Sequence, residues 1–282
     1  MSSLKRTVLI TGCSDGGMGA ALAIAFHKAG LQVYATARTP TKMSHLESIG
    51  IKTLTLDVQS ESSIAACVSK LPALDILVNN AGSGLSMPIA DVAVLEAKKL
   101  FDLNVWSHLS VTQAFLPLLM KSSNGMIVNQ TSIAAVTAVP WQGVYSASKA
   151  ALAMLSDVLR LELQPFCIKV IDLRTGIVNT NFIKNMVESV KPSLPEGSIY
   201  EPVKEVVEKG LRLGVHEGGS MPAEQWAESV VHDLLKKKPP AVIWKGDSAF
   251  LARIGTVLPF GTLDSTVKSM TGLDVVEQMM RK

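Results

Sequence analysis

Short apolar runs alternate with longer segments of helical periodicity along most of the chain. The runs are rich in valine, isoleucine and leucine without strict alternation of polar and apolar positions, which is typical of strands buried on both faces of a parallel sheet. Because strands and helices alternate, we predict an α/β fold, a doubly wound parallel sheet of about seven strands with helices on both faces. The predicted strands are residues 7–11, 32–37, 52–58, 75–81, 125–132, 168–174 and 240–246.

The segments between these runs carry apolar side chains at the spacing of amphipathic helices. Residues 18–29 and 143–164 are each predicted to form one helix. A third helix is expected over residues 94–120, bent or interrupted near Pro117, because proline lacks an amide hydrogen and its ring clashes with the preceding turn. No internal repeat or low-complexity linker divides the chain, so we expect residues 1–282 to form a single domain.

A segment rich in glycine and proline precedes the last predicted strand. Residues 181–222 contain short helical pieces between these residues, and long irregular segments in compact domains are commonly functional. We predict that this segment is a lid over a substrate, and a surface excursion without a role is the alternative. An apolar extension, residues 247–282, follows the last strand. Three explanations stay open for its stretch 249–260: peripheral contact with a membrane, a partner surface, or part of the lid.

Composition and charge narrow the classes of function. Hydrophobic residues make up 48% of the chain and charged residues 18%, enough for a substantial core and too apolar for a disordered protein. The net charge of +3 is small and the basic residues are scattered, so nucleic acid is not an expected partner. No apolar stretch is long enough to span a membrane, and the first strand begins without a preceding signal peptide. We expect a cytoplasmic protein, or one attached peripherally to an intracellular membrane.

The cysteines and histidines point to no metal site. The three cysteines, Cys13, Cys67 and Cys167, match no zinc or CxxC spacing and are predicted to be reduced thiols. The five histidines are well separated and show no metal-ligand spacing, so each is expected to be a surface or hydrogen-bonded buried side chain.

A glycine-rich turn, TGCSDGGMG at residues 11–19, joins the first predicted strand to the first helix. Glycines let the backbone turn tightly and approach a pyrophosphate, and the helix N-terminus offers free N–H groups and the positive end of its dipole. An ordinary turn is the alternative, but the position between a strand and a helix favours the phosphate-binding loop of a dinucleotide site.

The second predicted strand ends at Arg38, where an NAD site would place an acidic residue on the ribose 2′-hydroxyl. No carboxylate is present near this point. A guanidinium can instead hold a 2′-phosphate through paired, charge-assisted hydrogen bonds, and Lys42 is close enough in sequence to add charge. We therefore predict NADPH/NADP as the cofactor, with a solvated loop arginine as the alternative.

Candidate chemistry lies at the start of the helix over 143–164. Tyr145 and Lys149 are four residues apart and so share one helix face. We expect the ammonium to lower the pKa of the phenol from about 10, so that the tyrosine can exchange a proton during hydride transfer. Ser132, at the end of the fifth strand, could hold the substrate oxygen. Trp141 lies between them in sequence, and both a place in the substrate site and core packing stay open for it.

Further motifs occur in the same order along the chain: Asp57 after the third strand, Asn79-Asn80-Ala81-Gly82 after the fourth, and Asn104 in the next helix. Together with the glycine turn, the serine and the Tyr–Lys pair, they resemble the short-chain dehydrogenase/reductase family in order and approximate spacing over nearly the whole chain. The resemblance implies a Rossmann fold, a homo-oligomer (dimer or tetramer) and NADPH-dependent reduction of a ketone or aldehyde of a hydrophobic substrate, or the reverse.

The resemblance also implies a role for each matched residue. The catalytic group is Ser132, Tyr145, Lys149 and Asn104, where Asn104 holds a water that relays protons between Lys149 and solvent. Asp57 contacts the adenine, the segment from Asn79 supports the central strand and the adenosine ribose, and Lys149 binds the nicotinamide ribose. Val178 and Thr180 touch the carboxamide region. The expected cofactor-binding residues are Gly12, Ser14, Gly17, Gly19, Arg38, Asp57, Asn79, Tyr145, Lys149, Val178 and Thr180.

Two departures from the family pattern stand out. Gly12 and Gly19 are separated by one residue more than usual, which leaves open whether Gly16 or Gly17 takes the middle role. Thr175 stands where the family usually has proline, which loosens one φ angle and removes no catalytic group. Both departures resemble a subgroup of mainly fungal reductases similar to 1-acyl-dihydroxyacetone-phosphate reductase. Many of its members act in secondary metabolism, so the subgroup does not fix the substrate, and both lipid and secondary metabolism are expected settings.

A second class of function stays open at this point. The fold could serve as an NADP(H)-bound scaffold or carry a non-redox step. A scaffold is expected to lose Tyr145 or Lys149, and this chain keeps both together with Ser132 and Asn104. The sequence therefore favours the oxidoreductase.

Overall fold

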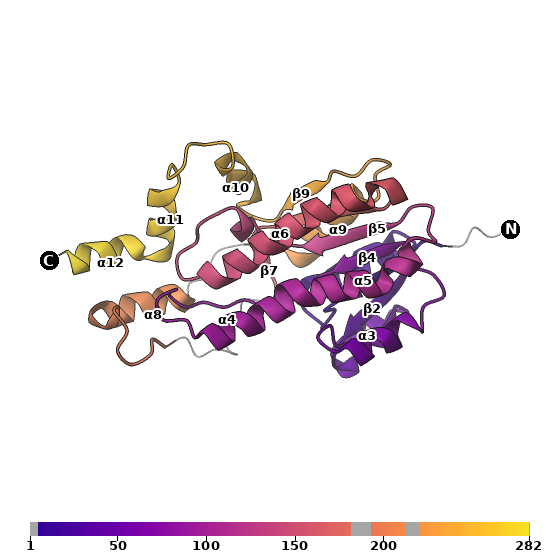
Figure 1. The fold of residues 1–282 in the computed structure, drawn as a ribbon, viewed down its shortest axis with the longest axis horizontal. Coiled ribbons are helices and arrows are strands. Elements are labelled where there is room, and N and C mark those ends of the chain that lie inside the picture. The colour runs from indigo at the N-terminus through magenta and orange to yellow at the C-terminus, as the bar shows by residue number, and fades with distance from the viewer. Residues whose placement is uncertain (1–4, 182–192, 213–219, 282) are drawn as a thin grey trace.

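A seven-stranded parallel sheet forms the centre of the protein (Figure 1). The computed structural model describes residues 5–181, 193–212 and 220–281. The strands are β1 (Thr7–Thr11), β2 (Gln32–Ala37), β3 (Lys52–Thr55), β4 (Ile76–Asn79), β5 (Met126–Gln130), β6 (Lys169–Thr175) and β9 (Val242–Lys245). Their order in the sheet is β3-β2-β1-β4-β5-β6-β9, and every neighbouring pair is parallel. The order reverses between β1 and β4, which places a ligand-binding crevice at their carboxyl ends.

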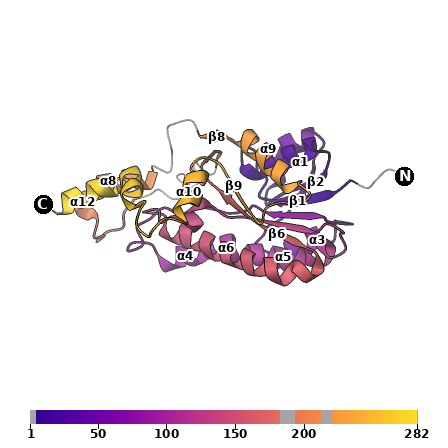
Figure 2. The same ribbon diagram turned by 90° about the horizontal axis from the view of Figure 1, so that it is seen from above.

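Helices cover both faces of the sheet, as predicted (Figure 2). One face carries α1 (Met18–Lys28) and α9 (Ala223–Leu234), and the other carries α3 (Glu61–Val68), α5 (Ser107–Leu119) and α6 (Gly143–Leu163). Val8 and Ile10 of β1 belong to the core cluster under α1 and α9, whereas Leu9 between them belongs to the cluster on the opposite face. Because both faces are buried, apolar residues occupy successive positions in the middle of the strand, which explains a run such as Val8 to Ile10 without alternation.

The long helix predicted over 94–120 is interrupted, but not at Pro117. It consists of α4 (Val94–Phe101), one π-helical turn (Asp102–Trp106) and α5, and Pro117 lies inside α5. Pro117 and Gln113, whose carbonyl loses its helical partner, are both exposed, so water can satisfy that carbonyl. The break instead falls at the π-helical turn, a feature often found at functional sites.

The predicted lid and C-terminal extension contribute a small lobe beside the sheet. Residues 182–192 and 213–219 of the predicted lid lie outside the described residues. Its described part holds a 3₁₀ turn (Glu201–Val203), α8 (Lys204–Arg212) and β8 (Met221–Pro222), which pairs with β7 (Val178–Asn179). The extension forms α10 (Ala249–Gly255), α11 (Asp264–Thr271) and α12 (Leu273–Met280), and α8 lies beside α12 (Figure 1). A 3₁₀ turn (Pro40–Met43) and the short helix α2 (Ser44–Ser48) follow β2.

Membrane contact was one of the open explanations for the extension. Within the described ranges, no helix combines the length and the apolar character needed to cross a bilayer. Phe250, Val257 and Phe260 of the stretch 249–260 are nevertheless exposed to solvent.

Candidate active site

The glycine-rich turn lies at the reversal point of the sheet and packs against the loop after β4. A Cβ atom at Gly19 would stand 2.5 Å from the Gly12 carbonyl oxygen and 2.6 Å from Asn80 Nδ2, so only glycine fits there. Asn80 Nδ2 donates to the carbonyl oxygens of Thr11 and Gly12 at 2.8 and 3.2 Å. The backbone of the turn is therefore held close to β4 and directed at the N-terminus of α1.

The extra residue in the turn is accommodated at Gly16. Gly16 has a φ of +75°, a left-handed conformation that glycine adopts without strain, and its carbonyl accepts a hydrogen bond from Asn181 N at 3.1 Å. Gly17 follows in an extended conformation as the N-cap of α1. The sequence left open whether Gly16 or Gly17 is the middle glycine of the turn. The structure places Gly17 at the start of α1 and Gly16 in the turn before it.

The N-terminus of α1 suits a phosphate group. No side chain in the described part of the chain caps this end of the helix, so its first N–H groups are available to an anion. Ser14 lies in the same turn, and its carbonyl accepts the Gly17 N–H at 3.0 Å. The residues present therefore fit the pyrophosphate of a dinucleotide.

Arg38 and Lys42 lie beside this turn, as expected. The Lys42 carbonyl accepts a hydrogen bond from Asp15 N at 2.8 Å, which fixes the segment after β2 against the glycine turn. Arg38 and Lys42 are both exposed. Asp57 lies at the end of the neighbouring strand, and its carboxylate accepts the Gln59 N–H at 3.0 Å.

Asn79 acts inside the protein. Its side chain is buried, and Nδ2 donates to Thr112 Oγ1 and Asn129 Oδ1, both at 2.9 Å. Asn129 Nδ2 in turn donates to Ser156 Oγ at 2.8 Å. This chain of bonds joins β4, α5, β5 and α6, which agrees with the expected support of the central strand. Sequence reasoning missed Asn129, although a polar residue in the apolar run 125–132 was a visible signal.

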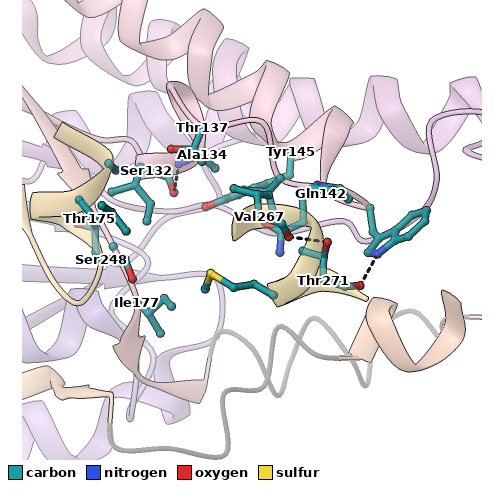
Figure 3. Close-up of a pocket in the computed structure, with 18 of the residues that line it drawn as sticks. Ser132, Ala134, Thr137, Gln142, Tyr145, Thr175, Ile177, Ser248, Val267 and Thr271 are labelled. Carbon is teal, nitrogen blue, oxygen red and sulfur yellow. Dashed lines mark hydrogen bonds between the residues drawn. The ribbon is translucent and has the colours of Figure 1, made fainter. Parts of the chain in front are cut away.

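Ser132 and Tyr145 meet at the carboxyl end of β5. Ser132 accepts a hydrogen bond from Ala134 N at 3.1 Å, which orients its hydroxyl, and it forms a hydrogen bond with the Tyr145 hydroxyl. Figure 3 shows the Tyr145 hydroxyl directed toward Ser132. Both residues line one cavity of about 280 Å³. A substrate oxygen in this cavity can therefore reach two hydroxyl groups.

Lys149 lies one helical turn further along α6 and is buried. Its Nζ donates to the Gln130 carbonyl at 2.8 Å and stands 5.9 Å from the centre of the Tyr145 ring. Burial lowers the pKa of Lys149 to about 8, and the negative charge of Asp172 opposes part of that shift.

The expected lowering of the Tyr145 pKa is wrong in sign. The pKa of Tyr145 is raised, because burial disfavours the phenolate, and the hydrogen bond with Ser132 offsets this only in part. The Lys149 ammonium donates to the Gln130 carbonyl and stands 5.9 Å from the centre of the Tyr145 ring, and burial remains the larger influence on the pKa of the phenol. Tyr145 is consequently a proton donor at neutral pH in this arrangement.

Asn104 is fully buried in the π-helical turn. Its Nδ2 donates to Ser83 O at 2.9 Å and Ser148 Oγ at 3.1 Å, and its Oδ1 accepts from Ser83 N at 2.9 Å. A Cβ atom at Gly82 would lie 3.1 Å from Asn104 Oδ1 and 3.6 Å from Lys149 Nζ. Asn104 and Lys149 therefore face the same small space, with the asparagine joining the loop after β4 to α6.

The residue that replaces the family's proline is fixed by a hydrogen bond. Thr175 is buried, and its Oγ1 accepts from Gln130 Nε2 at 2.6 Å. The same Gln130 holds Lys149 through its backbone, so Thr175 is linked to the Tyr–Lys pair. Val178 and Thr180, further along this segment, line the cavity together with Tyr145. Sequence reasoning missed Gln130, and its polar side chain at the end of an apolar strand was the available signal.

The glycine-rich turn and the side chains of Ser132, Tyr145 and Lys149 lie at one edge of this doubly wound sheet, with Tyr145 partly exposed to the cavity. Residues 6–191 match the family model of short chain dehydrogenases. The chain belongs to the short-chain dehydrogenase/reductase family, whose members act on alcohol and carbonyl groups.

Relatives and solved structures agree with this assignment. The chain is 56% identical over 281 residues to short-chain dehydrogenase/reductase GME11361 of Pestalotiopsis microspora, covering 100% of this chain and 99% of that one. It is 34% identical over 285 residues, 95% of each chain, to the NADPH-dependent 1-acyldihydroxyacetone phosphate reductase of Schizosaccharomyces pombe. The crystal structure of a short-chain dehydrogenase from Streptomyces avermitilis superimposes with a TM-score of 0.76 at 26% identity, covering 98% of both chains.

Proposed function

We propose that this protein uses NADPH to reduce the carbonyl group of a hydrophobic small molecule to an alcohol. The observation that carries the proposal is the hydrogen-bonded Ser132–Tyr145 pair, which lines the cavity beside buried Lys149. The uncapped N-terminus of α1 would hold the pyrophosphate, and Arg38 with Lys42 would hold the 2′-phosphate. The NADPH dependence named for the Schizosaccharomyces pombe relative supports this choice of cofactor.

The chemistry divides between cofactor and protein. NADPH, when bound, supplies the hydride to the carbonyl carbon. The Tyr145 hydroxyl donates its proton to the substrate oxygen, and the Ser132 hydroxyl holds that oxygen in reach of the phenol. The positive charge of Lys149 stabilises the phenolate that forms. Tyr145 then regains a proton from solvent through a water beside Asn104 and through Lys149. Because the pKa of Tyr145 is raised, the protonated form needed for reduction prevails at neutral pH.

The alternative is a cofactor-bound scaffold without redox turnover, and one assay separates the two. Purified protein is mixed with NADPH, or with NADH, and a panel of lipid, steroid and polyketide ketones, while the absorbance of the reduced nicotinamide is followed. We expect substrate-dependent oxidation of NADPH with at least one ketone. NADPH binding without oxidation by any ketone would favour the scaffold.

Ketone reduction should lose rate in alkaline solution. Lys149, with its pKa lowered to about 8, is charged below that pH and neutral above it. Since the charged form supports proton donation by Tyr145, kcat/KM for reduction should be level below about pH 7 and fall as the pH rises through about 8. Oxidation of the product alcohol, in which Tyr145 accepts a proton, should show the opposite trend. A rate of reduction that rises steadily from about pH 6 to about pH 9, the range in which Lys149 titrates, would contradict these roles.

We also propose that the protein forms a homo-oligomer through the α4–α6 face. Met154, Val158 and Leu161 of α6 are exposed and spaced as one helical stripe, and Trp106 with Leu95 adds exposed apolar surface on the neighbouring segment. An apolar stripe of this kind is typical of a surface that is covered in the assembly.

A charge in the centre of this stripe should break the assembly. Val158→Glu is expected to lower the mass in solution, measured by light scattering, because a carboxylate buried in an apolar interface loses its hydration. Val257→Glu, a matched change at an exposed position outside the stripe, should leave the mass unchanged. An unmutated protein that is monomeric, or an unchanged mass for Val158→Glu, would refute the proposed interface.

A further inference from the structure

The outer wall of the substrate cavity comes from the C-terminal extension. The segment from Leu263 to Thr271, which includes α11, lines the cavity, and Leu251 and Ala252 of α10 line it as well. Among the described residues of the predicted lid, only Gly210 lines the cavity. Figure 3 shows Val267 and Thr271 on the side of the cavity that faces away from Ser132. The described lid residues therefore form little of the wall that α11 provides.

Trp141 connects this wall to the catalytic helix. Its indole Nε1 donates to the Thr271 carbonyl at 3.0 Å, and its ring packs edge-on against Tyr200 at 5.5 Å. The Trp141 carbonyl accepts the Met87 N–H at 2.7 Å. Trp141 is four residues before Tyr145, so one residue joins the start of α6 to the last residue of α11.

The backbone of Trp141 indicates that this connection is specifically built. Its φ of +69° is costly for a bulky side chain and persists only where surrounding contacts enforce it. On the opposite side, a Cβ atom at Gly210 would lie 2.9 Å from the indole nitrogen and 2.8 Å from the Thr271 carbonyl oxygen. Glycine at 210 thus leaves room for the hydrogen bond between Trp141 and Thr271.

The lining of the cavity defines the kind of molecule that fits it. Methionine, leucine, isoleucine and valine side chains make up much of the wall, with serine, threonine and glutamine between them. None of the described lining residues is an arginine, lysine, histidine, aspartate or glutamate. A charged group on the substrate would lose its hydration in this space without gaining a counter-charge from those residues.

We propose that α11, held by the Trp141–Thr271 hydrogen bond, is the distal wall of the substrate cavity and fits it to an uncharged, largely apolar carbonyl compound. This inference rests on the proposed function and specifies its substrate class. Trp141 also lines the cavity, and it is a positioning residue for the reaction because its indole holds α11 and is not among the groups that act on the reacting atoms.

Two methionines of the C-terminal helices give a matched test of the wall. Met270 lines the cavity and is 51% exposed, whereas Met279 on α12 is 48% exposed and does not line it. Met270→Ala should raise KM for a long apolar ketone about ten-fold, since each buried CH₂ group contributes roughly a four-fold change in affinity. Met279→Ala should leave KM unchanged, and kcat/KM for a small, water-soluble ketone should be the same in all three proteins.

Trp141→Phe tests the connection itself. The variant keeps an aromatic ring but lacks the N–H group, and the loss of one hydrogen bond should raise KM for the long ketone roughly two- to ten-fold. The kcat and the value of KM for the small ketone should change little, because Tyr145 and Ser132 are intact. A fall in kcat for both ketones would instead show that Trp141 supports the whole of α6 and would overturn its role in the wall.

The same assays test the class of substrate. A ketone carrying a phosphate ester should have a KM at least about ten-fold higher than the matched ketone carrying a hydroxyl, and an equal or lower KM would overturn the proposal of an uncharged substrate. If the unmutated protein reduces ketones with NADPH but Met270→Ala behaves as Met279→Ala does, the wall proposal fails and the proposed function stands. If no ketone is reduced at all, both fail together.

Discussion

Replacing Tyr145 by phenylalanine is expected to lower turnover by about 10²- to 10⁴-fold, the usual contribution of general acid–base catalysis. The change removes the phenol hydroxyl, which we propose gives its proton to the substrate oxygen, and leaves the Ser132 hydroxyl in the cavity. NADPH affinity should change little, because the glycine turn and Arg38 are untouched. Initial rates and a fluorescence titration of NADPH measure the two effects separately.

Tyr34→Phe is the matched control for this variant. Tyr34 lies on β2 and is buried on the face of the sheet that α3 and α5 cover, and its hydroxyl accepts a hydrogen bond from Gln32 Nε2 at 2.6 Å, outside the cavity lining. The control should retain turnover even if it loses some stability. Turnover of Tyr145→Phe within a few-fold of the unmutated protein would show that another group supplies the proton.

Removing the guanidinium of Arg38 should weaken NADPH binding by roughly ten-fold or more and leave NADH binding almost unchanged. Hydrogen bonds to a charged group such as the 2′-phosphate typically contribute about 1.5–3 kcal/mol, and NADH has no such phosphate. The affinities of Arg38→Ala and of the unmutated protein for NADPH and for NADH are measured by titration. The ratio of the two affinities is then compared between the two proteins. The unmutated protein should bind NADPH more tightly than NADH.

Arg160→Ala controls for a general loss of positive charge. Arg160 is an arginine on α6 that pairs with Asp157 at 2.8 Å, and it lies outside the glycine turn. This variant should keep the preference for NADPH. An equal loss of affinity for both cofactors in Arg38→Ala would show that Arg38 supports the loop rather than the phosphate.

The strands of the sheet could be predicted because burial on both faces leaves a signal in the sequence itself. All five residues of β1 are buried, and the run 7–11 has three apolar residues in succession, Val8 to Ile10, between two threonines. Tyr145 and Lys149 could likewise be paired from their spacing, since residues four apart share a helix face. In both cases the information is local, and no knowledge of distant contacts was needed.

The sign of the Tyr145 shift depended on contacts that spacing does not reveal. Lys149 donates to the carbonyl of Gln130, on a strand, and the phenol is buried beside Ser132. Burial therefore outweighs any help from the ammonium, and the pKa of the phenol rises. The sequence showed which groups come together but not which of these effects prevails.

The break in the α4–α5 helix was misplaced for a related reason. Pro117 is a visible signal, but its exposed position lets the helix continue through it. The π-helical turn instead contains Asn104, whose side chain bonds to Ser83 and Ser148 in other segments. Such a turn is stabilised by tertiary contacts, and these are absent from any local pattern.

The C-terminal helices were missed because their sequence is mixed. Residues 264–271 carry serine, threonine and lysine among few apolar side chains, and α11 contains no fully buried residue. Its position instead depends on Trp141, more than a hundred positions earlier in the chain, and on the neighbouring α12. This is the part of the site that only the three-dimensional structure could reveal.

Hydride transfer from NADPH to a carbonyl carbon can be followed with NADPH that carries deuterium at the transferred position. The protein is incubated with this cofactor and the best ketone of the panel, and the alcohol product is analysed by mass spectrometry. We expect one deuterium on the carbinol carbon of the product, formed at a rate that Tyr145→Phe lowers by about 10²-fold or more. Alcohol without deuterium, or NADPH that binds while no ketone of the panel acquires the label, would contradict hydride transfer to the carbonyl carbon.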